Sequence, residues 1–219
     1  MTSRRVTAIV PHPRKPGRFS LEVDSENIAT LSIEAIERLR LITGAAFDDR
    51  IAADVEREAG ILATYDHALS MLAARGRASH DLRCVLVKKG EPAACVDVAI
   101  ERLERAGFLN DASFARHFTR AKVIGGGLSR RRVQQELTKR GVPREVTVEA
   151  IDAVFIEEGV DEEVSLERIA RKKLRTLSKV DAPTRKRRLY SFLARRGYDG
   201  SDIVRVIRIV LADVGDWEE

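Results

Sequence analysis

Cysteine, histidine and aromatic residues are scarce in this chain of 219 residues, and their scarcity removes several classes of function. The two cysteines, Cys84 and Cys95, form no CxxC pair, and the four histidines form no HxxxH or HExxH pattern, so we expect no metal site. Both cysteines are expected to be small buried side chains. Aromatic residues make up only 5%, which disfavours an enzyme with a large aromatic cofactor pocket.

Long apolar runs and catalytic motifs are also missing. No apolar run approaches the length of about 18 residues that a membrane-spanning helix needs, and the N-terminal "MTSRRVT" lacks the apolar region of a secretion signal, so we expect a cytoplasmic protein. The glycines at 125–127 are not part of a GxxxxGK[ST] phosphate loop, and we expect a flexible loop there. No G-x-S-x-G elbow or nucleophile–base pair is found. The sequence therefore predicts no enzyme and no cofactor.

Charge is sorted along the chain, although the net charge is only +5. Residues 116–141 hold eight Lys and Arg against one acid, and residues 168–196 hold twelve against one. Residues 142–167, which lie between these blocks, hold nine acids against one arginine, and residues 197–219 hold six acids and two arginines. Such blocks indicate basic faces for a polyanion, with solvated helix surfaces as the alternative interpretation.

The first sixty residues differ from the rest. Residues 6–10 and 19–23 alternate apolar and polar side chains on either side of "PHPRKPG", which predicts a β-hairpin, with a short third strand at Ile28–Thr30. Ser32 is suited to be the N-cap of a following amphipathic helix, and a further helix is expected around Asp48–Glu58. An isolated hairpin is marginal in water, so a helix must cover its apolar face.

A repeated helical pattern follows from residue 61. Three basic pairs are each followed by a glycine, at Gly90, Gly141 and Gly197. A leucine stands four residues before each glycine and another apolar residue four residues earlier, which places both on one helix face. Glycine suits the left-handed position that ends a helix. The glycines are 51 and 56 residues apart, a spacing typical of a three-helix unit.

These patterns predict a mainly α fold: three tandem three-helix repeats in an elongated, curved array, preceded by a small β-hairpin-containing N-terminal domain. The expected boundaries are 1–60 for the N-terminal domain, 61–109 for the first repeat, 110–160 for the second, and 161–219 for the third repeat with an acidic tail. We call the three repeats modules one, two and three.

Basic residues stand where helices of modules two and three are expected to begin. Ser129 is a candidate N-cap before Arg130–Arg132, and Thr184 is a candidate N-cap before Arg185–Arg188. The positive end of the helix dipole disfavours cations there by about 0.3–1 kcal/mol each. An anionic partner would reverse this preference, because backbone N–H groups and guanidinium groups can converge on phosphate or carboxylate oxygens. In module one, Asp81 occupies the first turn instead, so modules two and three are expected to meet the polyanion.

A helix-turn-helix transcription regulator is one alternative, and a general DNA-binding helical-repeat protein is another. The third helix of a helix-turn-helix unit normally enters the major groove. In modules one and two the corresponding segments, 94–107 and 145–159, are mixed to strongly acidic and would be repelled by phosphates. The helix-turn-helix transcription regulator is therefore the weaker of the two hypotheses.

Three segments resemble the RecX family: "ALSMLAARGRASHDLRCVLVKKG", "VDVAIERLERAGFLNDASFARHF" and "LSRRRVQQELTKRGV". The resemblance covers nearly the whole chain, although "YDGSDI" in module three replaces the glycine-valine-proline that follows in module two. It implies a non-enzymatic regulator of the bacterial recombinase RecA, with roles in homologous recombination, DNA repair and the SOS response. Family members lie in the groove of the RecA filament on single-stranded DNA and oppose filament extension, ATP hydrolysis and strand exchange.

The resulting hypothesis assigns filament and DNA binding to the basic residues of modules two and three. We expect a monomer whose partners are the RecA filament and single-stranded DNA, with duplex DNA as an alternative target and no membrane contact. Phe114 and Phe118 are expected in the core, not on a base-stacking platform. The candidate contact residues are Arg130, Arg131, Arg132, Lys139, Arg140, Lys172, Lys173, Arg185, Lys186, Arg187, Arg188, Arg195 and Arg196.

Overall fold

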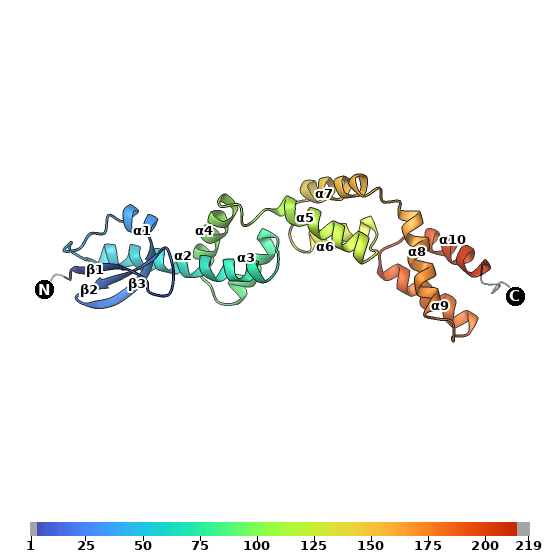
Figure 1. Cartoon of the computed structure of the whole chain (residues 1–219), viewed down its shortest axis with the longest axis horizontal. Helices are drawn as coiled ribbons and strands as arrows, with labels where there is room; N and C mark the ends of the chain where they lie inside the picture. The colour runs from blue at the N-terminus through green and yellow to red at the C-terminus, as the bar shows by residue number, and fades with distance from the viewer. Residues whose placement is uncertain (1–3, 214–219) are drawn as a thin grey trace. The chain divides into compact units, whose positions relative to one another are not determined.

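The computed structural model describes residues 4–213, and Figure 1 shows the order of their elements. The chain divides into two compact units, Met1–Leu109 and Asn110–Glu219, which are described separately. The end of the predicted acidic tail, from residue 214 onward, and the first three residues of "MTSRRVT" lie outside the described part.

A three-stranded antiparallel sheet begins the N-terminal unit. It consists of β1 (Val6–Pro11), β2 (Arg18–Val23) and β3 (Glu26–Ser32), in that order. Asp24 and Ser25 turn β2 into β3 with positive φ angles of 51° and 68°, as a two-residue hairpin loop requires. The hairpin and the third strand predicted from the sequence are confirmed, and the third strand is longer than expected.

Two helices cover this sheet, α1 (Ile33–Arg38) and the long α2 (Asp49–Ala74). The Ser32 hydroxyl accepts the Ala35 N–H at 3.3 Å, which confirms Ser32 as the N-cap of α1. The helix expected at Asp48–Glu58 is not separate, because α2 continues for 26 residues across the predicted boundary at residue 60. One helix therefore covers the sheet with its first half and belongs to module one with its second half.

Module one packs α3 (Ser79–Lys88) and α4 (Ala93–Arg105) against the second half of α2. Ala68, Leu82 and Leu86 lie fully buried in its core. The Glu58 carboxylate on α2 is also buried, and it accepts hydrogen bonds from Arg38 at 2.9 Å and from Arg102 at 3.1 Å. These two ion pairs link the β-containing part of the unit to module one, since a buried carboxylate needs charged partners.

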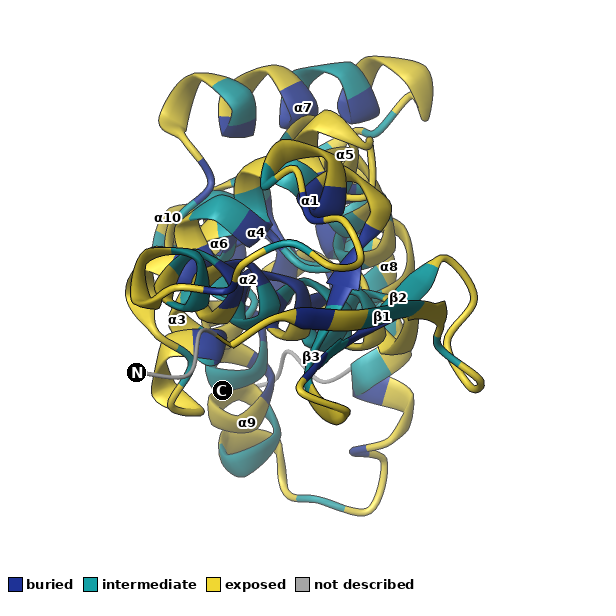
Figure 2. Cartoon of the chain, turned by 90° about the vertical axis from the view of Figure 1, so that its left-hand side faces the viewer, coloured by how far each residue is buried: buried dark blue, intermediate teal, exposed yellow. Residues whose placement is uncertain are grey.

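The C-terminal unit contains modules two and three. Module two consists of α5 (Asp111–Arg120), the π-helical turn η1 (Ala121–Gly125), α6 (Arg130–Thr138) and α7 (Arg144–Glu157). Module three consists of α8 (Glu162–Arg175), α9 (Ala182–Arg195) and α10 (Gly200–Ala212). Figure 2 shows buried residues along one side of α7 and exposed residues along the other, as expected of a helix that covers a core.

The repeated glycine pattern has the predicted structural role. Gly90, Gly141 and Gly197 follow the middle helices of the three modules with φ angles of 95°, 76° and 88°. The leucines four residues earlier are all fully buried. The mainly α fold of three three-helix modules after a small β-containing domain is therefore confirmed.

Several local expectations were wrong. Cys84 is exposed, and only Cys95 is buried. Phe114 and Phe118 are half-buried, with ring centroids 5.8 Å apart. The loop expected at 125–127 is found only in part: Gly125 ends the π-helical turn η1, whereas Gly126 and Gly127 lie in the connection to α6, and a Cβ atom on Gly127 would come within 2.4 Å of Ile169 Cδ1.

Candidate nucleic-acid interface

The start of α6 already contains an anion from the same chain. Ser129 caps the helix, and its hydroxyl accepts the Arg132 N–H at 3.2 Å. The Arg130 N–H donates to Glu162 Oε1 at 2.8 Å. Glu162, at the start of α8, thus places negative charge where the helix dipole favours it. This carboxylate offsets part of the dipole cost that the arginines impose.

The three arginines at this helix start have different surroundings. Arg130 pairs with Asp152 of α7, and its guanidinium carbon lies 4.5 Å from the centre of the Phe155 ring. Arg132 Nε lies 3.3 Å from the Glu136 carboxylate one turn further along. Arg131 is exposed and has no ion pair among the described residues. Of the three, Arg131 is the most available to an external anion.

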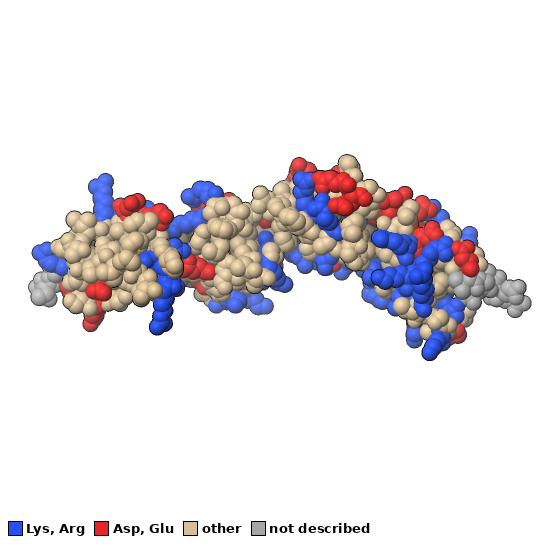
Figure 3. Space-filling model, in the orientation of Figure 1, with Lys and Arg blue, Asp and Glu red and all other residues tan. Residues whose placement is uncertain are grey.

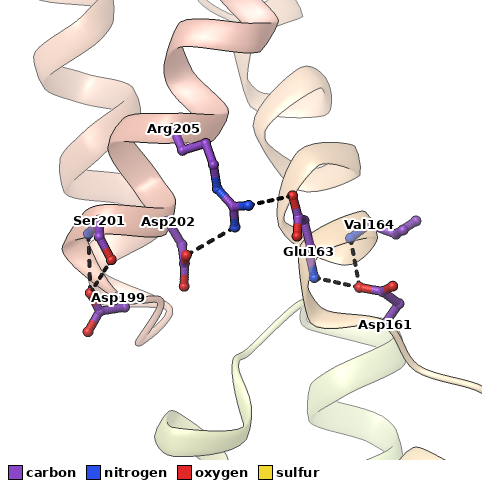
Figure 4. A network of polar contacts seen from close by, with 7 residues as sticks. All are labelled: Asp161, Glu163, Val164, Asp199, Ser201, Asp202 and Arg205. Carbon is purple, nitrogen blue, oxygen red and sulfur yellow. Dashed lines mark hydrogen bonds and ion pairs between the residues drawn. The ribbon is translucent and has the colours of Figure 1, made fainter.

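Figure 4 shows the polar network beside this helix start. Arg205 of α10 bridges Asp202, at 3.1 Å, and Glu163 of α8, at 2.9 Å. Hydrogen bonds from the Ser201 N–H and hydroxyl, with a smaller effect of Arg131, lower the pKa of the Asp199 carboxyl. The adjoining cavity of about 360 Å³ is lined by the first residues of α6, α8 and α10, and its charge is mixed.

The start of α9 lies three residues before the predicted position. Asp181, not Thr184, is the N-cap, and its carboxylate accepts the Thr184 N–H at 3.0 Å. This bond and the Thr184 hydroxyl lower the pKa of Asp181. An Asp cap followed by proline at the start of the helix forms a stronger helix start than threonine. The basic run 185–188 therefore follows the first turn, and the dipole argument does not apply to it.

The four basic residues of the α9 run have different surroundings. The Arg185 guanidinium donates to the Val180 carbonyl at 2.8 Å, so it helps to hold the segment before the helix. Arg187 and Arg188 are exposed, and neither has a salt bridge within the described chain. Lys186 is exposed as well.

Acidic residues of α7 neutralise arginines of α5. Arg120 contacts Glu158 at 2.5 Å and Glu157 at 3.0 Å, and Arg116 also pairs with Glu157. Hydrogen bonding to Glu158 and the nearby negative charges raise the pKa of Arg120. Figure 3 shows acidic side chains over α7 and a cluster of basic side chains over α8 and α9. The positive charge of the C-terminal unit is thus concentrated on α8 and α9, since residues 168–196 hold twelve Lys and Arg against one acid.

Lys172, Lys173 and Arg196 come together on α8 and at the end of α9. The Arg196 guanidinium carbon lies 4.0 Å from the centre of the Phe192 ring, and Lys173 Nζ lies 5.3 Å from the same ring. All three line one cavity, which Arg168 also lines. The sequence interpretation missed Arg168, although it precedes Lys172 by one helical turn and the basic residues at this spacing could have revealed it.

The remaining candidates do not line this cavity. Arg140 donates to the Glu136 carbonyl at 2.8 Å, and its guanidinium lies 4.5 Å from the Phe118 ring centre. Lys139, beside it, is exposed, and Arg195 is exposed in the last turn of α9.

Neither a membrane span nor a metal site is found between residues 4 and 213. None of the helices in this range combines the length and apolar character that crossing a membrane requires. The same range contains no group of three or more His, Cys, Asp or Glu side chains placed to hold a metal ion.

Comparisons with known proteins agree on one family. The family model described as "RecX, second three-helix domain" matches residues 110–151, and "RecX, third three-helix domain" matches residues 161–207. "Regulatory protein RecX" of Amycolatopsis mediterranei (strain U-32) is 37% identical over 145 residues, which cover 66% of this chain and 81% of the relative. Its namesake from Streptomyces lividans is 32% identical over 151 residues, covering 69% of this chain and 79% of the relative.

Two solved structures share the fold. A crystal structure of regulatory protein RecX matches with a TM-score of 0.72 at 16% identity and covers 94% of this chain and 98% of its own. RecX from Lactobacillus salivarius matches with a TM-score of 0.54 at 16% identity, covering 69% of this chain and 96% of its own. With relatives above 30% identity that are matched over about four fifths of their length, the chain belongs to the RecX family of regulatory proteins.

Proposed function

We propose that this chain regulates RecA by binding the filament that RecA forms on single-stranded DNA. The basic surface of modules two and three lies in the filament groove and hinders filament extension, ATP hydrolysis and strand exchange. The chain acts by occupying the filament groove and carries out no chemical step of its own. Membership of the RecX family supports this proposal, because the relatives are named as regulatory proteins.

The observation that carries the proposal is a set of exposed cations without carboxylate partners. Elsewhere in the C-terminal unit, arginines such as Arg116, Arg120 and Arg171 pair with acids of the same chain. Cations without such pairs have no evident role in folding, and they suit a polyanion. Several of the candidate contact residues are exposed and form no ion pair within the described residues. They are Arg131, Lys139, Lys172, Arg187, Arg188 and Arg195.

The acids of module two argue against a reader of duplex DNA. Asp152, Glu157 and Glu158 of α7 are ion-paired to arginines of α5 and α6, so α7 serves as a cover for its own module. A recognition helix in the major groove would instead present basic and amide side chains to the bases.

Binding to three targets at matched salt tests the proposal. Fluorescence anisotropy of the labelled protein is measured with bare single-stranded DNA, bare duplex DNA, and the RecA filament formed with a non-hydrolysable nucleotide. We expect clear preference for the filament, because contacts to RecA add to contacts with phosphates. Equal affinity for bare DNA with a steep salt dependence would identify a general DNA-binding protein instead. Strong preference for one duplex sequence would identify a transcription regulator.

A further inference from the structure

A basic cavity lies between the glycine segment of module two and helices α8 and α9 of module three. Its volume is about 290 Å³, and four of its lining residues are basic: Arg168, Lys172, Lys173 and Arg196. Within residues 4–213, no carboxylate lines it, and none of these four side chains forms a salt bridge. A comparable cavity at the start of α6 contains acids that balance its arginines.

Stability does not account for this arrangement. Arg168 and Lys172 stand one turn apart on α8, where like charges repel each other. Arg171, on the same helix, has the opposite arrangement, because it pairs with Glu167 at 2.7 Å and with Asp213 at 2.5 Å. On α8, the charge of Arg171 is therefore neutralised by acids, whereas Arg168 and Lys172 line the cavity without an acidic partner in the described chain.

One buried donor in the cavity wall has no partner. The Nε atom of Arg196 is inaccessible to solvent and forms no hydrogen bond. Buried donors are normally satisfied, so this unpaired one is a local cost to the folded chain, and because it has no accessible surface it is not itself a contact for a ligand. The Phe192 ring, 4.0 Å from the guanidinium carbon, holds this side chain in position before any ligand arrives.

The glycine segment allows module two to approach this basic wall closely. Gly127 has a φ of +61°, and a Cβ atom there would overlap Ile169 of α8. The Gly126 and Gly127 N–H groups already donate to the carbonyls of Ala121 and Val123, at 3.2 and 3.0 Å. The donors for a ligand are therefore side chains, and the site differs in this respect from a backbone phosphate loop.

We propose that this cavity binds a phosphate group that carries an organic substituent, namely a phosphodiester of single-stranded DNA. Phosphate oxygens accept from several cationic donors at once, and lysine and arginine are the side chains that bind them best. The volume of about 290 Å³ is many times the roughly 10–15 Å³ that a single water needs, so it exceeds the needs of a bare ion and leaves room for the attached sugar. This inference rests on the proposed function, which brings a strand of phosphates to the protein.

The first test uses nuclear magnetic resonance of the full-length protein labelled with 15N at its 14 glycines. Addition of the oligonucleotide (dT)8 is expected to shift the amide signals of Gly125, Gly126 and Gly127. The Gly90 signal, from the N-terminal unit, is expected to remain in place. Absence of any shift at 125–127 would overturn the proposal. Shifts produced by ATP or inorganic phosphate at lower concentration than by (dT)8 would overturn its assignment to a DNA strand.

The second test compares variants in anisotropy measurements with (dT)8. Arg168→Ala/Lys172→Ala is expected to weaken binding about tenfold. It is also expected to make the slope of log affinity against log salt concentration shallower by about 0.7 for each phosphate that the variant no longer neutralises. Lys88→Ala/Lys89→Ala removes the same charge from an exposed site in the N-terminal unit and is expected to leave affinity nearly unchanged. Equal reductions of affinity in the two double variants would contradict a localised site.

A third variant separates cavity shape from charge. Gly125 lines the cavity, has no positive φ, and leaves open space where a Cβ atom would stand. Gly125→Leu is therefore expected to fold, to narrow the cavity and to weaken (dT)8 binding without any change of charge. Unchanged affinity in a variant with native circular dichroism would overturn the proposal.

Failure of the cavity and failure of the proposed function give different results. If the wild-type protein prefers the RecA filament and the cavity variants keep both this preference and their (dT)8 affinity, only the cavity assignment fails. If the wild-type protein binds the filament no better than bare DNA while the glycine signals respond to (dT)8, the proposed function fails and the cavity assignment stands.

Discussion

Neighbouring arginines at the start of α6 have different surroundings. Arg130 contacts Asp152 and the Phe155 ring, whereas Arg131 is exposed and has no ion pair in the described chain. Arg130→Ala is expected to lower the free energy of unfolding by about 1 kcal/mol, because it removes an ion pair and a cation–π interaction. Arg131→Ala is expected to change it by less than about 0.5 kcal/mol and to weaken filament binding. Urea unfolding and filament anisotropy on both variants check this.

The assignment of Arg131 fails if Arg131→Ala destabilises the unit as much as Arg130→Ala. It also fails if only Arg130→Ala affects filament binding in a protein that is still folded under the assay conditions.

Tyr198 provides a prediction about pH. Burial raises the pKa of its phenol to about 12, with Glu162 adding to this effect, while the ordinary value is 10.0. The folded state thus holds the proton more tightly than the unfolded chain. Stability from this group is fully present below pH 10 and is lost as the pH rises through 12. Absorbance at 295 nm is expected to show one of the three tyrosines ionising late, and Tyr198→Phe should remove that late step.

Ionisation of all three tyrosines near pH 10, with circular dichroism still native, would contradict the buried environment of Tyr198.

At the scale of the helix, one glycine position serves two purposes in different modules. Gly90 and Gly197 both have positive φ, but a Cβ atom at Gly90 would meet open space, while at Gly197 it would lie 2.5 Å from Arg132 Cβ. Gly90→Ala is expected to lower the free energy of unfolding by about 1–2 kcal/mol, because alanine is strained in the left-handed backbone conformation. Gly197→Ala should cost a further 1–3 kcal/mol, roughly, for overpacking between modules two and three. Hydrogen exchange measured separately in each unit checks the difference.

If Gly90→Ala and Gly197→Ala lower the free energy of unfolding equally, α6 can move away from Gly197 without penalty. The close approach of modules two and three would then have little energetic importance.

Helical repeats were predictable because their signals are local. The leucine, basic pair and glycine of each module lie within five residues, and each has a direct role in ending and burying a helix. The continuity of α2 was not predictable in this way, because the close packing at its middle, where a Cβ atom added to Gly60 would lie 3.3 Å from Cys95 Sγ, comes from a distant helix. At α9, two good N-cap residues compete, and the choice of Asp181 depends on the backbone between the helices.

At the scale of the molecule, the sequence reveals blocks of charge but not which charges cancel. Arg116 and Glu157 are 41 residues apart, and Arg171 and Asp213 are 42 apart, so only the packing of the helices brings each pair together. The sequence interpretation therefore weighted Arg130 and Arg131 equally and missed Arg168. Folding removes some arginines from the candidate interface and gathers others around one cavity.

The most direct test of this account compares two double variants that each remove two positive charges from the C-terminal unit. Arg187→Ala/Arg188→Ala removes exposed cations without salt bridges in the described chain, whereas Arg116→Ala/Arg120→Ala removes cations paired with Glu157 and Glu158. Affinity for the RecA filament is measured at one salt concentration, with circular dichroism to verify folding. We predict that affinity falls about tenfold for Arg187→Ala/Arg188→Ala and changes little for Arg116→Ala/Arg120→Ala. The loss of two phosphate or carboxylate contacts of modest strength accounts for the tenfold decrease. Equal reductions would mean that total charge, and not the unpaired cations, governs binding, and would contradict the account.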